Sequence, residues 1–302
     1  MALKDIKAKI GATKRMHTVT RAMEAVSAVK MRKTQATAFS GRPYARAALS
    51  ILARLSGAED IKRHALATTR PVEKVAMVIL TSDKGLAGAL NSGVIKAAAL
   101  EAAKYPKESV TIFAYGKKGM EYFLRRGFTI AKSFENKRDD VPLSIMEELS
   151  RELSAGFVNK DYDKVVGVYS DFKSTFEQVP TTHTLLPLTL ESVEAIVRSI
   201  RPAKGKWSED HRIAAPASYE VESSHGEIMS VLVPRLVAIS LYHMLLEAKA
   251  SEHSARMVAM KSASDKSKEV ARDLTRLFNK VRQAAITREV SEIVGGREAL
   301  ST

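Results

Sequence analysis

Apolar residues recur at helical spacing near both ends of the chain. Toward the N-terminus they stand at Leu3, Ile6 and Ile10 and again at Val19, Met23, Val26 and Val29. Toward the C-terminus, the stretch from Glu227 to Val294 has no glycine and one proline, Pro234, and three-and-four spacing continues through Met257, Met260, Val270, Leu274, Leu277 and Val281. A helix of this length measures about 100 Å at about 1.5 Å per residue. That length is typical of a coiled coil or shaft and not of a compact domain.

The middle of the chain has a different pattern, in which short β-branched runs alternate with helical segments. The expected strands are VAMVILTSD (75–83), VTIFAYG (110–116) and KVVGVYSDF (164–172), with edge strands at 179–188 and 217–222. The expected helices cover 92–104, 117–126, 143–157 and 191–200. Alternating strands and helices predict an α/β domain with a largely parallel central sheet.

These patterns divide the chain into three regions. We expect an N-terminal helix over residues 1–56, a central α/β domain over 57–226 and a C-terminal helix over 227–302. The narrow apolar stripes of the two terminal helices predict that they pair with each other as an antiparallel coiled coil, with the α/β domain at one end. The pair Gly295–Gly296 is expected to mark the end of the C-terminal helix.

Charge suggests an acidic partner. The formal net charge is +14, and residues 1–46 alone hold eleven Lys and Arg against Asp5 and Glu24. A basic helix of this kind could bind nucleic acid, an anionic membrane surface or an acidic protein. The absence of cysteine excludes disulfides and thiol chemistry, and the charged start MALKDIKAKI predicts no secretory signal.

Catalytic and metal-binding motifs are weak. The stretch TSDKGLAGALNSG (81–93) follows a strand and precedes a helix, where phosphate-binding loops occur, but it lacks both glycine-rich phosphate-loop spacings. His243 and Glu247 are one helical turn apart, followed by Glu252 and His253, without a third ligand of the usual spacing. We therefore expect no catalytic residue, no bound cofactor and no metal, and interpret the glycines of 81–93 as turn residues.

Four stretches carry a resemblance to a known family. They are LKDIKAKI with VTRAMEAVSAVKMRKTQ (3–35), LTSDKGLAGALN (80–91), LLEAKASEHSARMVAMKSASD (245–265) and FNKVRQAAITREVSEIVGG (278–296). In this order, and over essentially the whole chain, they closely resemble the γ subunit of F-type ATP synthases. The resemblance implies a central-stalk rotor without catalytic activity of its own, with a Rossmann-like α/β domain that serves as a coupling piece. The resemblance implies that this rotor subunit couples proton flow through the membrane c-ring to conformational cycling of the catalytic β subunits.

The resemblance also implies partners and contact residues. The partners are the α and β subunits, the ε subunit and the c-ring, with membrane association only through the complex, at the cytoplasmic face of the bacterial plasma membrane. The β-subunit contacts implied by matching positions are Met23, Lys30, Arg32, Lys33, Arg256, Gln283, Thr287 and Glu289. Residues 205–218 match the family pattern poorly.

Two other functions remain open from the residues. A basic coiled coil that binds nucleic acid would use the N-terminal helix, although residues 1–38 contain no aromatic side chain for base stacking. A nucleotide-dependent α/β enzyme would bind its ligand at residues 81–93.

Overall fold

The fold was established from a computed structural model of the 302-residue chain, which describes residues 3–40, 64–136, 143–189 and 225–301. The chain divides into two compact units. One, here called the helix pair, is made by residues up to Ser27 together with residues from Met257 onward. The other, here called the α/β unit, runs from Ala28 to Arg256. Two long helices, α1 (Leu3–Ser40) and α8 (His225–Ser301), contribute to both units.

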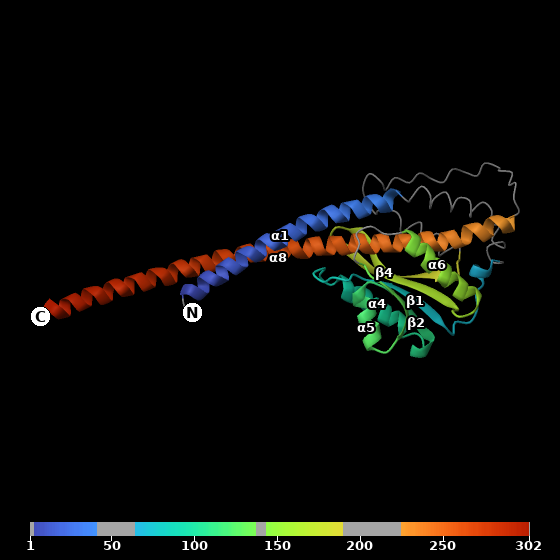
Figure 1. The fold of residues 1–302 in the computed structure, drawn as a ribbon, viewed down its shortest axis with the longest axis horizontal. Helices are drawn as coiled ribbons and strands as arrows, with labels where there is room; N and C mark the ends of the chain where they lie inside the picture. The colour runs from blue at the N-terminus through green and yellow to red at the C-terminus, as the bar shows by residue number, and fades with distance from the viewer. Residues whose placement is uncertain (1–2, 41–63, 137–142, 190–224, 302) are drawn as a thin grey trace. The chain divides into compact units, whose positions relative to one another are not determined.

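The α/β unit is built on one sheet (Figure 1). Its described strands are β1 (Val75–Leu80), β2 (Val110–Tyr115), β3 (Thr129–Phe134), β4 (Lys164–Ser174) and β5 (Glu177–Leu186). They lie in the order β3-β2-β1-β4-β5. All neighbouring strands are parallel except β5, which pairs antiparallel with β4 through a short hairpin. The predicted largely parallel sheet is thus confirmed, and β3 is a strand that the apolar pattern did not predict.

Helices cover both faces of this sheet (Figure 1). On one face α4 (Leu90–Ala102) and α5 (Lys117–Arg125) pack against Val75, Met77 and Ile79 of β1. On the other face α6 (Leu143–Val158) and the first part of α8 pack against the alternate side chains Ala76, Val78 and Leu80. Because both faces of β1 are buried, its sequence is continuously apolar.

The first part of α8 is a core helix. Val233, Val237, Leu241 and Leu245 belong to the same buried cluster as the sheet. Within Val231–Val294 one window is apolar enough to cross a membrane by length and composition alone, with a mean hydropathy of 1.5, but 61% of that window is buried inside the protein. Burial against the sheet accounts for its apolar character.

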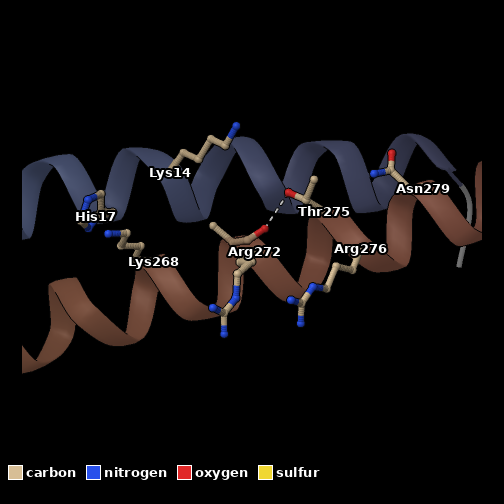
Figure 2. A pocket seen from close by; sticks show the side chains of 8 residues that line it. Lys14, His17, Lys268, Arg272, Thr275, Arg276 and Asn279 are labelled. Atoms are coloured by element: carbon tan, nitrogen blue, oxygen red, sulfur yellow. Dashed lines mark hydrogen bonds between the residues drawn. The ribbon is translucent and has the colours of Figure 1, made fainter.

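In the helix pair, the chain directions of α1 and α8 are antiparallel: the groove that they form runs from His17 to Lys14 on α1 and from Lys268 to Asn279 on α8 (Figure 2). The helix pair buries small and polar side chains together with two large apolar ones of the predicted stripes, Ile6 on α1 and Met260 on α8. Ser264, Ser267 and Ala271 are buried along α8, at a spacing of three and four residues. The ring Nδ1 of His17 lies 2.9 Å from the Ser264 hydroxyl oxygen.

Two features of the helices differ from expectation. Helix α8 continues through Gly295–Gly296 to Ser301, so the prediction that the double glycine ends it is wrong. A glycine within a helix costs about 1 kcal/mol relative to alanine and does not by itself end the helix. Helix α1 is described as far as Ser40. The rest of the expected helix 1–56, the expected elements 191–200 and 217–222, and residues 205–218 lie outside the described residues.

Candidate functional site

Several apolar residues that were expected to pack between the terminal helices are exposed. Val19 and Val26 in the helix pair are more than half exposed, and Val29 in the α/β unit is 65% exposed. On α8, Val270 and Leu277 are also exposed, whereas the neighbouring Ala271 is buried. Ile6 and Met260 of the predicted stripes are buried, but much of the contact uses small residues such as Ser264 and Ala271, and part of the apolar stripe faces outward.

The last part of α8 is also exposed. From Arg282 to Val294 all but one of the side chains are exposed, including Ile286, Val290, Ile293 and Val294. Ile293 is 71% exposed. A helix within a protein gains most of its stability from packing an apolar face, and an exposed apolar row of this kind is typical of a surface that another chain covers.

Three residues expected to contact β subunits lie on this exposed segment. Gln283, Thr287 and Glu289 are all exposed, and the Thr287 hydroxyl donates a hydrogen bond of 3.0 Å to the Gln283 carbonyl oxygen one turn earlier. Gln283 and Thr287 therefore share one face of the helix. In the helix pair, Met23 is half-buried on α1.

Basic residues form a groove in the helix pair (Figure 2). It has a volume of about 490 Å³, and its lining includes Lys14 from α1 and Lys268, Arg272 and Arg276 from α8. Figure 2 shows Arg272 and Arg276 one turn apart along α8. Asp273 lies 3.9 Å from Arg272 and 3.8 Å from Arg276, so it offsets only part of this positive charge.

A second basic cluster belongs to the α/β unit. Lys30 is half-buried on α1, and Arg32 and Lys33 are exposed. The neighbouring Met31 and Thr34 are buried, which fixes the face of α1 that the two exposed cations occupy. Exposed cations can attract an acidic surface, but each such pair contributes only about 0–1 kcal/mol.

Arg256 differs from the other expected contact residues because it is largely buried. Only 9% of the residue is exposed. Its guanidinium donates hydrogen bonds to Glu252 Oε1 at 2.7 Å and to the Gly85 carbonyl oxygen at 3.5 Å. Arg256 is thus bound to the turn after β1. A partner chain can reach the Arg256 guanidinium only by sharing or replacing these hydrogen bonds.

The turn after β1 is held by hydrogen bonds to its own side chains, although Asp83 Oδ2 is buried without a hydrogen-bond partner among the described residues. Asn91 accepts a hydrogen bond of 3.0 Å from the Ser82 backbone N–H, and Asp83 Oδ1 accepts one of 2.8 Å from the Lys117 N–H at the start of α5. A carboxylate of this chain therefore occupies an anion position at the N-terminus of α5. Leu86 and Gly88 adopt positive φ angles of 64° and 55°, as turn residues do.

Metal ligation has no geometric basis in the described residues. Among them, no group of three or more His, Asp and Glu side chains could hold an ion. His243 Nε2 and Glu247 Oε1 lie 3.6 Å apart within the core, on the face of α8 that packs against the sheet.

The sequence did not predict that Asn136 and Glu252 make contacts at this site. The Asn136 side-chain N–H₂ donates to the Thr81 carbonyl oxygen at 3.0 Å and to Glu252 Oε2 at 3.2 Å. Glu252 stands four residues before Arg256, a spacing that by itself indicates an ion pair on a helix. Nothing in the sequence places Asn136 beside them, since it lies 116 residues away from Glu252.

The fold and these surfaces define a class of protein. It has an α/β unit whose ligand-binding edge is filled by its own side chains, and long helices whose exposed apolar and basic surfaces are suited to partner chains. Surfaces of this kind are typical of a subunit that packs against other chains of an assembly.

Comparisons with known proteins identify the family. The family model described as ATP synthase matches residues 2–300. The ATP synthase gamma chain of Chlorobium phaeobacteroides (strain BS1) is 37% identical over 304 residues, which cover 99% of this chain and 98% of the relative. The ATP synthase gamma chain of Roseiflexus castenholzii (strain DSM 13941 / HLO8) is 38% identical, with the same coverage.

Solved structures show the same fold. A chain from the central stalk and c-ring of Tetrahymena thermophila mitochondrial ATP synthase has a TM-score of 0.60 at 23% identity, covering 82% of this chain and 99% of that chain. A chain of Euglena gracilis mitochondrial ATP synthase, in the OSCP/F1/c-ring assembly in rotational state 3, has a TM-score of 0.64 at 18% identity, covering 99% and 94%.

The chain belongs to the gamma-subunit family of ATP synthases. It is a non-catalytic, central-stalk rotor subunit and associates with the membrane as part of the ATP synthase complex. The alternatives, a nucleic-acid-binding coiled coil and a nucleotide-dependent enzyme, are not supported.

Proposed function

We propose that this subunit transmits rotation between a proton-driven c-ring and a catalytic hexamer of α and β subunits. In this proposal the α/β unit, together with the ε subunit, rests on the c-ring. The last part of α8 turns inside a sleeve formed by the α and β subunits and drives each β subunit through its conformational cycle in sequence. Hydrolysis of ATP drives the same rotation in reverse.

The observation that carries this proposal is the exposed apolar row Ile286, Val290, Ile293 and Val294. Covering these side chains with a partner would remove apolar area from water, which is favourable by about 25 cal/mol per Å². A rotor must be covered without being held at one angle, and a single helix with short apolar side chains makes shallow contacts that can be exchanged.

We propose that the polar residues on this helix make angle-dependent contacts. Gln283, Thr287 and Glu289 are exposed and available to hydrogen-bond loops of β subunits, and Met23 offers an adaptable thioether on α1. Arg256 would join this set only at angles where a partner competes with Glu252 or Gly85 for its guanidinium.

We propose that the basic surfaces attract acidic segments of the β subunits. In the cluster Lys30, Arg32 and Lys33, the last two are exposed and Lys30 is half-buried, and Lys14 and Arg272 of the groove are exposed. Attraction between exposed charges is screened by salt, with a Debye length of about 8 Å at physiological ionic strength. Such contacts bias the angle of the rotor without locking it.

The proposed location is the cytoplasmic face of the bacterial plasma membrane. Both terminal helices are rich in charged residues, and the most apolar window of α8 is largely buried in the α/β unit. Membrane association therefore comes from the complex.

Reconstitution tests this function. The isolated chain is expected to hydrolyse ATP at a negligible rate, and α and β subunits of the same complex are expected to gain robust hydrolysis when the full chain is added. A chain truncated after Arg282 keeps the α/β unit and the basic groove but lacks the exposed apolar row. It should support less hydrolysis than the full chain, and the double variant Arg32→Glu/Lys33→Glu should lower the gain mainly at low salt. If the full chain produces no gain, the proposal is wrong.

A further inference from the structure

The carboxyl edge of the sheet in the α/β unit is filled by side chains of α8. In doubly wound sheets, ligands bind at the carboxyl ends of the strands, where the strand order reverses. Here the reversal lies between β1 and β4, since the chain continues from β1 to β2 on one side and returns to β4 on the other. Residues at the carboxyl end of β4 and residues that follow β1, β3 and β4 bind α8.

One row of contacts joins α8 to β4 and its hairpin. Glu247 Oε2 accepts a hydrogen bond of 3.1 Å from the Phe172 N–H. The Ser251 hydroxyl donates to the Ser170 carbonyl oxygen at 3.0 Å, and the Ser254 hydroxyl donates to the Thr175 carbonyl oxygen at 2.7 Å. Glu247, Ser251 and Ser254 are spaced by four and three residues, so they form one stripe along the helix.

A second row joins α8 to the ends of β1 and β3. Glu252 accepts hydrogen bonds from Asn136 and from Arg256. Asn136 also donates to the Thr81 carbonyl oxygen, and Arg256 also donates to the Gly85 carbonyl oxygen. Glu252 accepts from both sides, through Oε2 and Oε1 respectively, and only 8% of the residue is exposed. Hydrogen bonds to a buried carboxylate are among the stronger polar contacts in a protein.

The two rows lie on different sides of α8. Residues 251 and 252 are adjacent in the helix and so point about 100° apart around its axis. One row binds β4, and the other binds the segments after β1 and β3. Contacts on two sides of the helix resist its rotation about its own axis more strongly than a single row of contacts would.

The second row also lies where α8 leaves the α/β unit. Arg256 is the last residue of α8 that belongs to this unit, and Met257 is the first that belongs to the helix pair. Glu252 and Arg256 therefore form the last turn through which the α/β unit can apply torque to the remainder of α8.

We propose that Glu252 is a positioning residue for energy coupling, which prevents α8 from turning within the α/β unit under load. It acts through Asn136 and Arg256 and touches neither nucleotide nor proton path. The inference rests on the proposed transmission between c-ring and β subunits and identifies the point in this chain at which the torque passes into the helix.

The test uses the complete ATP synthase complex in sealed vesicles, with Glu252→Gln in this subunit. The substitution keeps the size of the side chain and removes its charge. Hydrolysis of ATP should stay within about twofold of wild type, whereas protons pumped per ATP should fall by at least about threefold, as expected when a contact network of this strength is weakened. Asn136→Ala removes the link to Thr81 and should give the same loss.

The matched control is Glu269→Gln, also on α8. Glu269 pairs with Lys266 at 2.9 Å on the exposed surface, outside both rows of contacts, and its substitution should leave the ratio of protons to ATP unchanged.

An uncoupler distinguishes positioning from structural damage. A proton gradient slows hydrolysis in a tightly coupled complex, so an uncoupler stimulates it. In Glu252→Gln this stimulation should be largely lost, whereas a merely unstable subunit would lose hydrolysis and pumping in parallel and keep the stimulation.

Two results would overturn the inference while the proposed function stands: wild-type coupling in Glu252→Gln, or a parallel loss of hydrolysis and pumping. A wild-type complex without pumping would instead contradict the proposed function.

Discussion

The ring Nδ1 of His17 lies 3.0 Å from the carbonyl oxygen and 2.9 Å from the hydroxyl oxygen of Ser264, a residue 247 positions away in the chain. This contact fixes which residue of α1 faces which residue of α8 in the helix pair. It replaces the apolar interdigitation that a coiled coil of large side chains would use at the same place.

Loss of this contact should loosen the helix pair. His17→Ala is expected to raise hydrogen–deuterium exchange over residues 3–27, since a lost hydrogen bond that leaves the buried hydroxyl of Ser264 unsatisfied costs about 1–3 kcal/mol. Thr18→Ala is the matched control, because the exposed Thr18 hydroxyl donates to the Lys14 carbonyl oxygen of its own helix. Equal exchange in the two variants would show that the His17 contact does not hold the pair in register.

Two glycines with positive φ should respond differently to substitution by alanine. At Gly116 (φ 98°) an added Cβ would lie 1.9 Å from the Thr81 carbonyl oxygen, whereas at Gly88 (φ 55°) it would meet nothing within 4 Å. Gly88→Ala should therefore cost only the conformational penalty of about 1–2 kcal/mol. Gly116→Ala adds a backbone clash and should cost about 3 kcal/mol or more. Urea unfolding of the full chain measures both, and similar midpoints would contradict the close approach of Gly116 to the end of β1.

Asp163 should make stability depend on pH in the acid range. Burial by itself would raise the pKa of Asp163. The Lys74 and Glu73 N–H groups, which donate to its Oδ2, and the Arg70 guanidinium, 2.6 Å from its Oδ1, outweigh burial and lower the pKa below the ordinary value of 3.8. The ionised carboxylate therefore stabilises the fold above pH 3.8, and this contribution is lost as the pH falls toward the lower, folded-state pKa.

The variant Asp163→Asn tests this dependence. It should be less stable than wild type at neutral pH, and the difference in unfolding free energy should shrink below pH 3.8.

The exposed ion pair of Lys132 and Glu148 serves as a comparison for the salt dependence of stability. At about 1 M salt, where the Debye length is about 3 Å, the effect of Glu148→Gln should vanish and that of Asp163→Asn should persist. A difference that stays constant down to pH 2 would contradict the assignment.

A proline in α8 should impair coupling without affecting any nucleotide site. Ala263 lies in the helix pair, one residue before Ser264. Ala263→Pro removes a backbone hydrogen bond and should cost about 3 kcal/mol or more locally. ATP-driven proton pumping by the assembled complex should fall, while Ala263→Ser should pump normally. Normal pumping by the proline variant would show that an unbroken helix is not required.

Strands that are buried on both faces were predictable from sequence, because each is a continuous β-branched or aromatic run. The edge strand β3 was not, since half of its side chains are exposed and its residues Thr129, Lys132 and Ser133 give no apolar run. That both ends of the chain form long helices was predictable from periodicity, but the end of α8 was not, since the helix continues past Gly295–Gly296. The contact between these helices was less predictable, because periodicity does not distinguish Val270, which is exposed, from Ala271, which is buried.

The candidate contact residues came from resemblance and not from pattern. Exposure of Gln283, Thr287 and Glu289 agrees with a surface role, but which partner atoms they touch stays a prediction. Of the two contacts of Arg256, the one with Glu252 was predictable from the sequence and the one with Gly85 was not. The helical spacing indicates the first contact, and only the fold brings the turn after β1, 171 residues away, against α8.

The carboxylate of Asp83 at the start of α5 has a thermodynamic consequence for the α/β unit. A ligand that binds only the folded state stabilises it in proportion to the logarithm of its concentration. A domain whose anion position is filled by its own aspartate has no such dependence, because the capping group is present at a fixed effective concentration. The stability contributed at the start of α5 should therefore not change with the concentration of an anionic ligand, including the nucleotide that the complex produces.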